Sequence, residues 1–288
     1  MFSRPKMLVG KFLRKTGIFG EFFHKRDLRR NFYARFGYFP NVRSPRTFNE
    51  KIYCRMLLCK DTRLSQCSDK VLVKDYVREK LGDEFLIPTL YVGPQLPPVA
   101  LRNWPVPFVI KANHGSGMNL FVLSESNLDW PRIEGAVRKF LSCDYGSALG
   151  ERYYSAIERQ ILVEPFMSDD GKLPIDYKFY VFGGEPKLVH VDTDRGSDTK
   201  RVFYDPRWRR LDFTFHFPME TRSIERPASL PAMLRAASIL GKDFDFVRVD
   251  FYEVNSRPYF GEMTFTPGAG LDSFEPNEAD LMLGEMWP

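Results

Sequence analysis

Two segments near the C-terminal end carry carboxylates that alternation along a strand would bring to one face. Arg248 and Asp250 lie two apart in Val-Arg-Val-Asp-Phe, and Glu262 and Thr264 lie two apart in Gly-Glu-Met-Thr-Phe. Side chains alternate along a strand, so each pair shares a face, and pairing of the strands would make Asp250 and Glu262 converge. Oxygen ligands of this kind suit Mg²⁺ together with phosphate oxygens. An Arg248–Asp250 salt bridge, or solvated strand faces, is the alternative.

A second candidate site follows Lys111, which ends an apolar strand pattern. The glycine-rich loop after it comprises Asn113, His114, Gly115, Ser116 and Gly117. Backbone N–H groups of such a loop can approach phosphates closely, and a neighbouring lysine adds a point charge. Neither GxxxxGK[ST] nor GxGxxG occurs, and a plain hairpin turn is the alternative for the loop alone. Together with Lys70 and Lys74 upstream and the two carboxylates downstream, the loop indicates a nucleotide site.

Helices and hairpins must position these groups. Thr47 and Glu50 have capping-box spacing, which predicts a helix over residues 47–58. Helical spacing also occurs over residues 69–80, 130–143 and 230–240. Strand patterns cover residues 108–111, 120–123, 161–166, 176–182, 187–191, 246–252 and 257–265. Consecutive strands joined by short turns predict an α+β fold of mostly antiparallel hairpins, not a Rossmann fold.

Charge is unevenly distributed along the 288 residues, whose formal net charge is +5. Residues 1–46 hold 12 Lys/Arg and 2 Asp/Glu (12 − 2 = +10), which leaves 30 − 35 = −5 for residues 47–288. Basic and apolar residues interleave at the N-terminal end, so residues 1–30 could contact an anionic membrane surface. The alternatives are a terminal helix packed on the body with a solvated basic face, or nucleic-acid contact. No basic motif in the body extends a nucleic-acid footprint, so we expect no nucleic-acid partner.

Localisation follows from what the sequence lacks. No uncharged apolar run reaches the roughly 18 residues that a spanning helix needs, and charges interrupt every candidate signal-peptide core. The four cysteines form no CxxC pair, and the four histidines are scattered. This pattern provides neither zinc-ligand spacing nor a secreted disulfide scaffold. We expect a cytoplasmic protein with reduced thiols, with the inner membrane face as the place for any peripheral contact.

In their order along the chain, these motifs resemble the ATP-grasp superfamily. They are most similar to its TupA-like branch, which is associated with bacterial cell-surface polysaccharide synthesis. The resemblance runs from about Phe48 to Gly284. It implies two lobes of mostly antiparallel sheet, with helices, that clasp ATP between them. The expected division is a basic segment (residues 1–46), N-terminal helices and a first lobe with the glycine-rich loop (47–165), and a second lobe with the metal carboxylates (166–288).

For ATP, the resemblance implies a set of contacts. Lys111 would contact the α- and β-phosphates, Lys70 would be the second phosphate lysine with Lys74 as its rival, and residues 113–117 would close over the phosphates. The hinge strand at Glu164, Pro165 and Phe166 would contact the adenine. Asp176 would be the acid that binds the ribose hydroxyls. Lys178 is a further candidate for ATP binding, with a solvated strand charge as the alternative.

For the chemistry, the resemblance implies that Asp250 and Glu262 bind the metal. Thr264 is the third candidate metal residue: it stands where many relatives carry a third ligand, commonly Asn, and threonine is the poorer ligand. The candidate catalytic residues are Arg248, which would stabilise a developing oxyanion, and Lys111. The candidate substrate residues are Arg195, Arg201 and Thr266, and a mobile solvent loop is the alternative for the two arginines.

The expected cofactors are ATP and Mg²⁺, with two ions. The expected reaction is ADP-forming ligation of a carboxylate to an amine through an acyl-phosphate. The expected substrates are an amino acid or other amine and the uronic-acid carboxylate of a lipid-linked or nucleotide-linked sugar, in capsular or teichuronic-type polysaccharide synthesis. One alternative is an ATP-dependent sugar kinase, with His114 or Asp192 as the general base. Another is a glycosyltransferase-like protein whose carboxylates bind the metal of a nucleotide sugar.

Overall fold

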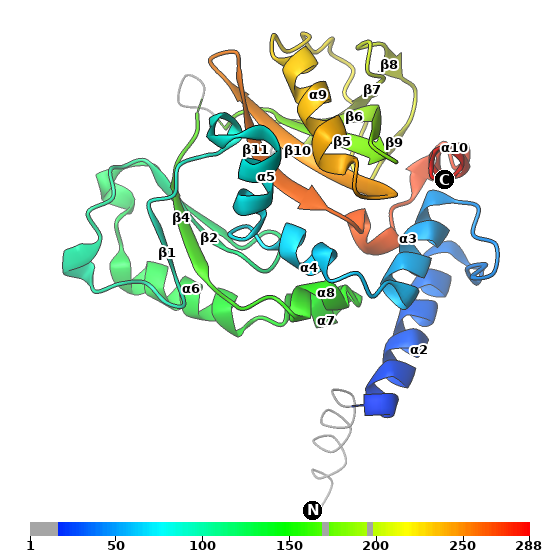
Figure 1. Cartoon of the computed structure of the whole chain (residues 1–288), viewed down its shortest axis with the longest axis horizontal. Helices are drawn as coiled ribbons and strands as arrows, with labels where there is room; N and C mark the ends of the chain where they lie inside the picture. The colour runs from blue at the N-terminus through cyan, green and yellow to red at the C-terminus, as the bar shows by residue number, and fades with distance from the viewer. Residues whose placement is uncertain (1–16, 169–172, 195–197) are drawn as a thin grey trace, which may run out of the picture.

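Two antiparallel sheets organise the chain (Figure 1). The computed structural model describes residues 17–168, 173–194 and 198–288. The four-stranded sheet has the order β1-β4-β2-β3, with β1 (Tyr91–Gly93), β2 (Phe108–Ala112), β3 (Asn119–Val122) and β4 (Ile161–Pro165). Every strand pairing in it is antiparallel.

The larger sheet has six strands in the order β11-β10-β5-β6-β7-β8, again all antiparallel. Its strands are β5 (Asp176–Phe182), β6 (Glu185–Thr193), β7 (Lys200–Tyr204), β8 (Arg210–Leu211), β10 (Phe246–Val254) and β11 (Arg257–Thr264). A small two-stranded sheet joins β9 (Thr214–Phe215) to β12 (Phe274–Glu275). The α+β prediction is confirmed, and so are the three hairpins that the strand patterns indicate.

Helices cover both sheets. They are α2 (Gly17–Phe36), α3 (Phe48–Leu58), α4 (Arg63–Ser68), α5 (Val73–Leu81), α6 (Trp130–Ser142), α7 (Tyr145–Leu149), α8 (Arg152–Ser155), α9 (Leu230–Gly241) and α10 (Glu278–Met286). In the described residues, the 3-10 turns are η1 (Asp83–Phe85), η2 (Val99–Leu101), η3 (Glu125–Asn127) and η4 (Pro267–Gly270). The capping box predicted at the start of α3 is present, with Thr47 and Glu50 each bonded to the other's backbone. In the described ranges no helix has the length and apolar character needed to span a membrane.

The six-stranded sheet has one largely apolar face and one divided face. On the apolar face, α9 and α5 pack against residues such as Phe179 and Val249. Part of the other face packs against α3 and α10 in an aromatic cluster, where the ring centroids of Phe48 and Phe246 are 5.0 Å apart. Phe203, Phe213 and Phe215 belong to this cluster, so these aromatic residues form core.

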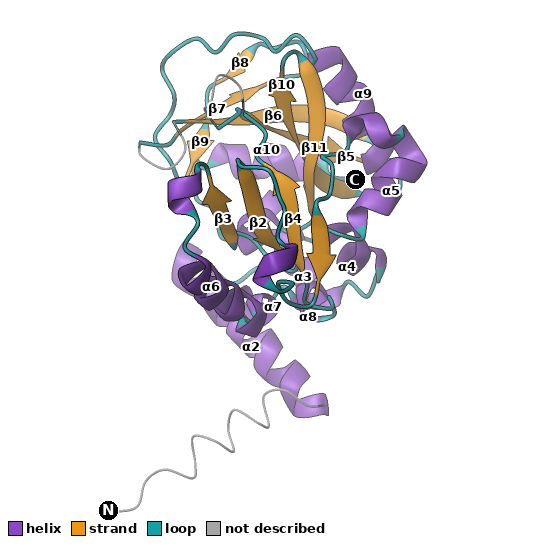
Figure 2. Ribbon diagram, turned by 90° about the vertical axis from the view of Figure 1, so that its left-hand side faces the viewer, coloured by secondary structure: helices purple, strands orange, loops and turns teal. Residues whose placement is uncertain are grey.

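The four-stranded sheet has its own core against α6, and it lies beside the β11 edge of the larger sheet (Figure 2). The helices α3, α4 and α5 precede this sheet in sequence, yet they pack on the larger one. Helices from residues 48–81 therefore belong spatially with the second lobe. The proposed division of the chain at residues 47 and 166 stays a prediction.

Candidate active site

Two rows of polar side chains cross the part of the large sheet that the aromatic cluster leaves uncovered. In the first row, Glu262, Asp250, Lys178 and His190 are register partners across β11, β10, β5 and β6. The neighbouring row is Asp176, Asp192 and Arg201, across β5, β6 and β7. Residues in register point to the same side of a sheet, so these charges share one surface.

Asp250 and Glu262 meet as the alternation pattern predicts. They are direct partners across β10 and β11, next to a bulge at which Gly261 takes the extra position. A Cβ on Gly261 would lie 3.1 Å from the backbone oxygen of Asp250, so glycine allows the strands to stay close there. The Arg248–Asp250 salt bridge considered as an alternative is also present, so the two interpretations are compatible.

Arg248 holds the carboxylates together. Its Nε and Nη2 donate to the two oxygens of Asp250 at 2.8 and 2.7 Å, and Nη2 also lies 3.2 Å from Glu262 Oε1. Thr264 Oγ1 accepts from the same guanidinium at 3.0 Å and donates to Glu262 at 3.3 Å. Thr264 is therefore a hydrogen-bond partner of the candidate metal ligands.

The two carboxylates differ in acidity. Burial, reinforced by Asp176 and Glu262, raises the pKa of Asp250 to about 7 against the effect of Arg248. Burial also opposes ionisation of Glu262, but Lys70 and Arg248 outweigh it and lower its pKa to about 2. Cations beside the pair thus keep at least one carboxylate ionised.

The structure distinguishes the two rival lysines. Lys70 Nζ lies 3.3 Å from Glu262 Oε2 and donates to the Gly115 carbonyl at 2.8 Å, so it joins the carboxylates to the glycine-rich loop. Lys74 Nζ instead donates to the carbonyl of Ile87, to Thr89 and to Glu164. The position of Lys70 fits a phosphate contact better.

Glu164 is buried between two cations. Lys111 Nζ lies 2.7 Å from Glu164 Oε2, and Lys74 pairs with the other oxygen. Although burial opposes it, Lys111 and Lys74 lower the pKa of Glu164. The carboxylate thus positions these lysines. Of the three predicted hinge residues, Pro165 and Phe166 line the crevice between the sheets, whereas Glu164 does not.

That crevice has a volume of about 90 Å³ and combines basic and aromatic residues. Among the residues that line it are Lys70, Lys111, Phe121, Phe166, Tyr252 and Glu262. Pockets for drug-sized ligands typically measure roughly 300–1,000 Å³. Binding of a nucleotide here therefore requires the crevice to widen.

The glycine-rich loop has a fixed base and an exposed tip. The buried Asn113 amide donates to Asp69 at 3.0 Å and to the Glu158 carbonyl at 2.8 Å. His114 is 2% exposed, and both of its ring nitrogens lie 3.3 Å from oxygen atoms. Ser116 and Gly117 are exposed, so the tip is the part of the loop that can reach a phosphate.

The second polar row is centred on Asp192. Lys178 and Arg201 donate to its carboxylate at 2.7 Å each, and His190 Nε2 lies 2.8 Å away. Burial opposes ionisation, but these groups hold the pKa of Asp192 well below its usual range. Lys178 is buried, 3.3 Å from Asp176, so it is not a solvated strand charge.

The substrate candidates have different environments. Arg201 is 5% exposed and lies over the rings of Phe215 and Phe217, so it is not part of a solvent loop. Arg195 lies outside the described residues. Thr266 is buried and donates to Glu151, while its Oγ1 lies 2.7 Å from the Tyr153 hydroxyl.

Glu151 and Tyr153 were missed by reasoning from the sequence. Tyr153 donates to Glu151 at 3.2 Å, and burial raises the pKa of Glu151. The cluster connects α8 to the turn after β11, where Gly268, Ala269 and Gly270 all have positive φ. The run Gly-Glu-Arg-Tyr-Tyr (150–154), a lone acid beside aromatic residues, was the available signal.

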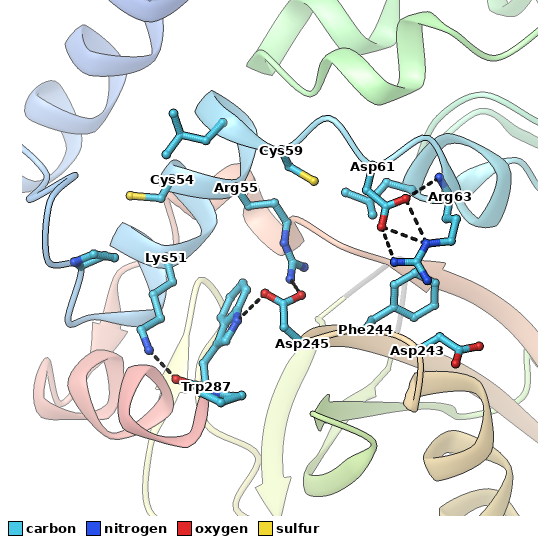
Figure 3. Close-up of a pocket in the computed structure, with 14 residues that line it drawn as sticks. Lys51, Cys54, Arg55, Cys59, Asp61, Arg63, Asp243, Phe244, Asp245 and Trp287 are labelled. Atoms are coloured by element: carbon cyan, nitrogen blue, oxygen red, sulfur yellow. Dashed lines mark hydrogen bonds and ion pairs between the residues drawn. The ribbon is translucent and has the colours of Figure 1, made fainter.

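The largest cavity among those described lies elsewhere. It has a volume of about 730 Å³ and lies between α3, the start of α4, the turn before β10 and Trp287 (Figure 3). Two ion pairs lie within its lining: Arg55 pairs with Asp245, and Arg63 pairs with Asp61. Size alone therefore does not identify the site.

The structure thus has a lysine-lined crevice between two antiparallel sheets, with paired carboxylates on one wall, as the resemblance to the ATP-grasp superfamily implies. The sequence matches the family model described as TupA-like ATPgrasp over residues 50–287. The chain belongs to this family, which confirms the resemblance seen in the sequence. No curated protein matches it.

Several solved structures are similar. D-alanine–D-alanine ligase from Bacillus anthracis, complexed with ATP, is 16% identical, with a TM-score of 0.43 over 78% of this chain and 66% of that one. D-alanine–D-alanine ligase from Helicobacter pylori is 16% identical, with a TM-score of 0.42 over 77% and 59%. L-amino acid ligase from Bacillus licheniformis is 15% identical, with a TM-score of 0.41 over 85% and 55%. The matches span 55–66% of the length of these proteins.

Proposed function

We propose that the protein is an ATP- and Mg²⁺-dependent carboxylate–amine ligase that forms an amide bond and releases ADP and phosphate. The observation that carries the proposal is the Asp250–Glu262 pair beside Arg248, joined through Lys70 to the glycine-rich loop. This arrangement combines ligands for a metal, cations for a triphosphate and a donor for a developing oxyanion.

The carboxylates fit Mg²⁺. Mg²⁺ usually binds one or two carboxylates plus substrate phosphates, and Asp250 and Glu262 supply two oxygen donors on adjacent strands. In the described part of the chain no group of three or more His, Cys, Asp or Glu residues forms a metal site, so phosphate oxygens would complete the coordination. When bound, the metal would neutralise charge on the triphosphate. Two ions remain our prediction for the number bound.

The protein's own groups would bind and orient the reactants. Lys70 and Lys111 would contact phosphate oxygens, while the loop tip at Ser116 and Gly117 would exclude water from the site. The substrate carboxylate attacks the γ-phosphorus in line, and ADP leaves. The amine then attacks the acyl-phosphate, phosphate leaves, and Arg248 stabilises the tetrahedral oxyanion.

The proposed acceptor is the uronic-acid carboxylate of a lipid-linked or nucleotide-linked sugar, and the proposed donor is an amino acid or other amine. This rests on the resemblance to the TupA-like branch and its association with cell-surface polysaccharide synthesis. The buried Arg201 would act through Asp192, because its guanidinium already donates to that carboxylate. Thr266 would shape the turn near Arg248, because its hydroxyl is engaged by Glu151 and Tyr153.

No observation favours the two alternatives. A kinase needs a general base near the γ-phosphate, but Asp192 is held by three basic groups and His114 is buried. A glycosyltransferase would leave the connection between Lys70 and the glycine-rich loop without a role.

A trapping experiment tests the proposal. The protein is incubated with Mg²⁺-ATP and a panel of uronic acids, and hydroxylamine replaces the amine. We expect ADP, free phosphate and a hydroxamate only with a suitable carboxylate. Phosphate retained on the sugar would establish a kinase, and UDP released from a nucleotide sugar would establish a glycosyltransferase. Two matched variants accompany the assay. Glu262→Gln should be inactive, whereas Glu185→Gln, at an exposed ion pair with Lys187, should keep its activity.

A further inference from the structure

Helix α2 carries aromatic or aliphatic side chains on two opposite faces. One face contributes Leu28 and Phe32, which are 4% and 1% exposed, to the aromatic cluster under α3. The packing alternative considered for the N-terminal segment is therefore correct for this face. A helix that packs on a domain through one face normally has a polar opposite face.

The opposite face of α2 departs from that rule. Phe22 and Tyr33 are 62% and 48% exposed, and Phe39, which follows the helix, is 52% exposed. The rings of Tyr33 and Phe39 stack with centroids 4.6 Å apart, and the Arg29 guanidinium lies 4.2 Å above the Phe39 ring. These contacts hold the segment after α2 against the exposed side of the helix.

Cations surround these rings. Residues 21–46 contain seven Lys/Arg and two Asp/Glu, so this segment carries 7 − 2 = +5. Phe22, Arg26, Arg29, Arg30 and Tyr33 are three or four residues apart along the helix, which places them on one side. We call these five residues and Phe39 the aromatic–arginine face. Figure 1 shows α2 extending away from the two sheets, and the three aromatic side chains of this face are exposed.

We propose that the aromatic–arginine face docks on the surface of an anionic phospholipid bilayer. Arginines would contact the lipid phosphates, while the three rings would enter the boundary between headgroups and acyl chains, where amphipathic aromatic residues are favoured. A nucleic-acid duplex would use the charge but leave Phe22 and Phe39 exposed to water, because its bases are already stacked on one another. The inference goes beyond the ligase function and does not depend on it.

Vesicle co-sedimentation with the full chain tests the docking. We expect binding to vesicles of phosphatidylcholine mixed with phosphatidylglycerol, weak binding to phosphatidylcholine alone, and release at high salt. Each basic residue near an anionic surface contributes about fivefold in affinity, so Arg26→Ala/Arg29→Ala/Arg30→Ala should weaken binding about 100-fold. Phe22→Ser/Tyr33→Ser/Phe39→Ser should weaken it at every salt concentration.

The control is a second set of exposed cations on another helix. Arg132→Ala/Arg138→Ala/Lys139→Ala on α6 removes the same charge and should bind like the wild type. Equal binding to both vesicle types, or equal loss in the α6 and α2 variants, would overturn the proposal. So would a concentration-dependent dimer that the serine variant converts to a monomer. Circular dichroism shows whether each variant folds, and the stabilisation by Mg²⁺-ATP shows whether it binds nucleotide. A failure of the ligase proposal can therefore be distinguished from a failure of the membrane-docking proposal.

Discussion

Replacing Glu164 by glutamine should destabilise the fold, because its carboxylate is the shared counter-ion of two lysines. The side chain of Glu164 is 4% exposed, and those of Lys74 and Lys111 are 12% and 17% exposed. Glutamine has nearly the same shape, but it leaves two ammonium groups with little water and no opposite charge. Removing one partner of a buried ion pair costs about 3–5 kcal/mol, so we expect the free energy of unfolding to fall by that amount.

A double-mutant cycle isolates the ion pair. Lys74→Met alone leaves Glu164 paired with Lys111, and Lys74→Met in the Glu164→Gln background removes an uncompensated cation. The double variant should therefore be more stable than the sum of the two single effects predicts, by about 1–3 kcal/mol. Urea-induced unfolding of the four proteins measures this difference.

The exposed pair Glu185–Lys187 provides the control. Its oxygen and nitrogen atoms are 2.7 Å apart, but the side chains are 69% and 36% exposed. Glu185→Gln should change the free energy of unfolding by less than about 1 kcal/mol. If Glu164→Gln costs no more than this control, or if the cycle is additive, Glu164 does not act as the shared counter-ion.

Three further predictions concern the crevice and its surroundings. Asp250→Asn and Glu262→Gln should each lower the rate of ADP release by more than about 100-fold, because loss of a hydrogen-bond partner of a metal ligand alone costs roughly 10–100-fold. The circular dichroism spectrum of each variant should stay unchanged. Burial lowers the pKa of His190, so below pH about 6.5 only the unfolded chain gains this proton. His190 therefore contributes a fall in the free energy of unfolding of up to about 1.4 kcal/mol per pH unit there, and the difference in that free energy between wild type and His190→Gln should change with pH by the same amount. Glu151→Ala should lower the free energy of unfolding by about 1–3 kcal/mol, because it removes the acceptor of the Thr266 hydrogen bond. Glu151→Gln should lower it by less, because burial raises the pKa of Glu151 and an amide oxygen can still accept from Thr266.

Each of these predictions has an outcome that contradicts it. Full turnover in either carboxylate variant would remove that residue from the metal site. A difference in unfolding free energy between wild type and His190→Gln that stays flat between pH 5 and 7 would show that His190 can take up a proton in the folded state. Equal unfolding free energies for Glu151→Ala and Glu151→Gln would mean that the hydrogen bond to Thr266 contributes nothing.

Short-range patterns carried most of the correct predictions. Alternation with a period of two places Arg248, Asp250 and Glu262 on one surface once their strands pair, and the structure has that pairing. The hairpin turns are local as well, since Gly183 and Gly184 both adopt positive φ. Because such features depend on neighbours in the sequence, they can be recognised without the fold.

The distinction between Lys70 and Lys74 required the structure. Both lie in a run with helical spacing, but the Asp69 carboxylate accepts from the backbone N–H groups of residues 71 and 72, and α5 begins only at Val73. Lys70 therefore precedes the helix and reaches Gly115 and Glu262. The Glu151–Thr266 contact was equally hidden, because 115 residues separate its partners.

The charges at the crevice suggest why the site keeps its shape before a nucleotide binds. Six cations there (Lys70, Lys74, Lys111, Lys178, Arg201 and Arg248) pair with five carboxylates (Glu164, Asp176, Asp192, Asp250 and Glu262). Mg²⁺ and phosphate bring both signs of charge, so the metal could take over Glu262 while Lys70 turns to phosphate. Binding would then exchange ion-pair partners without adding unpaired charge, which keeps the desolvation cost low. The acidic balance of residues 47–288 and the basic balance of residues 1–46 would thus serve different partners.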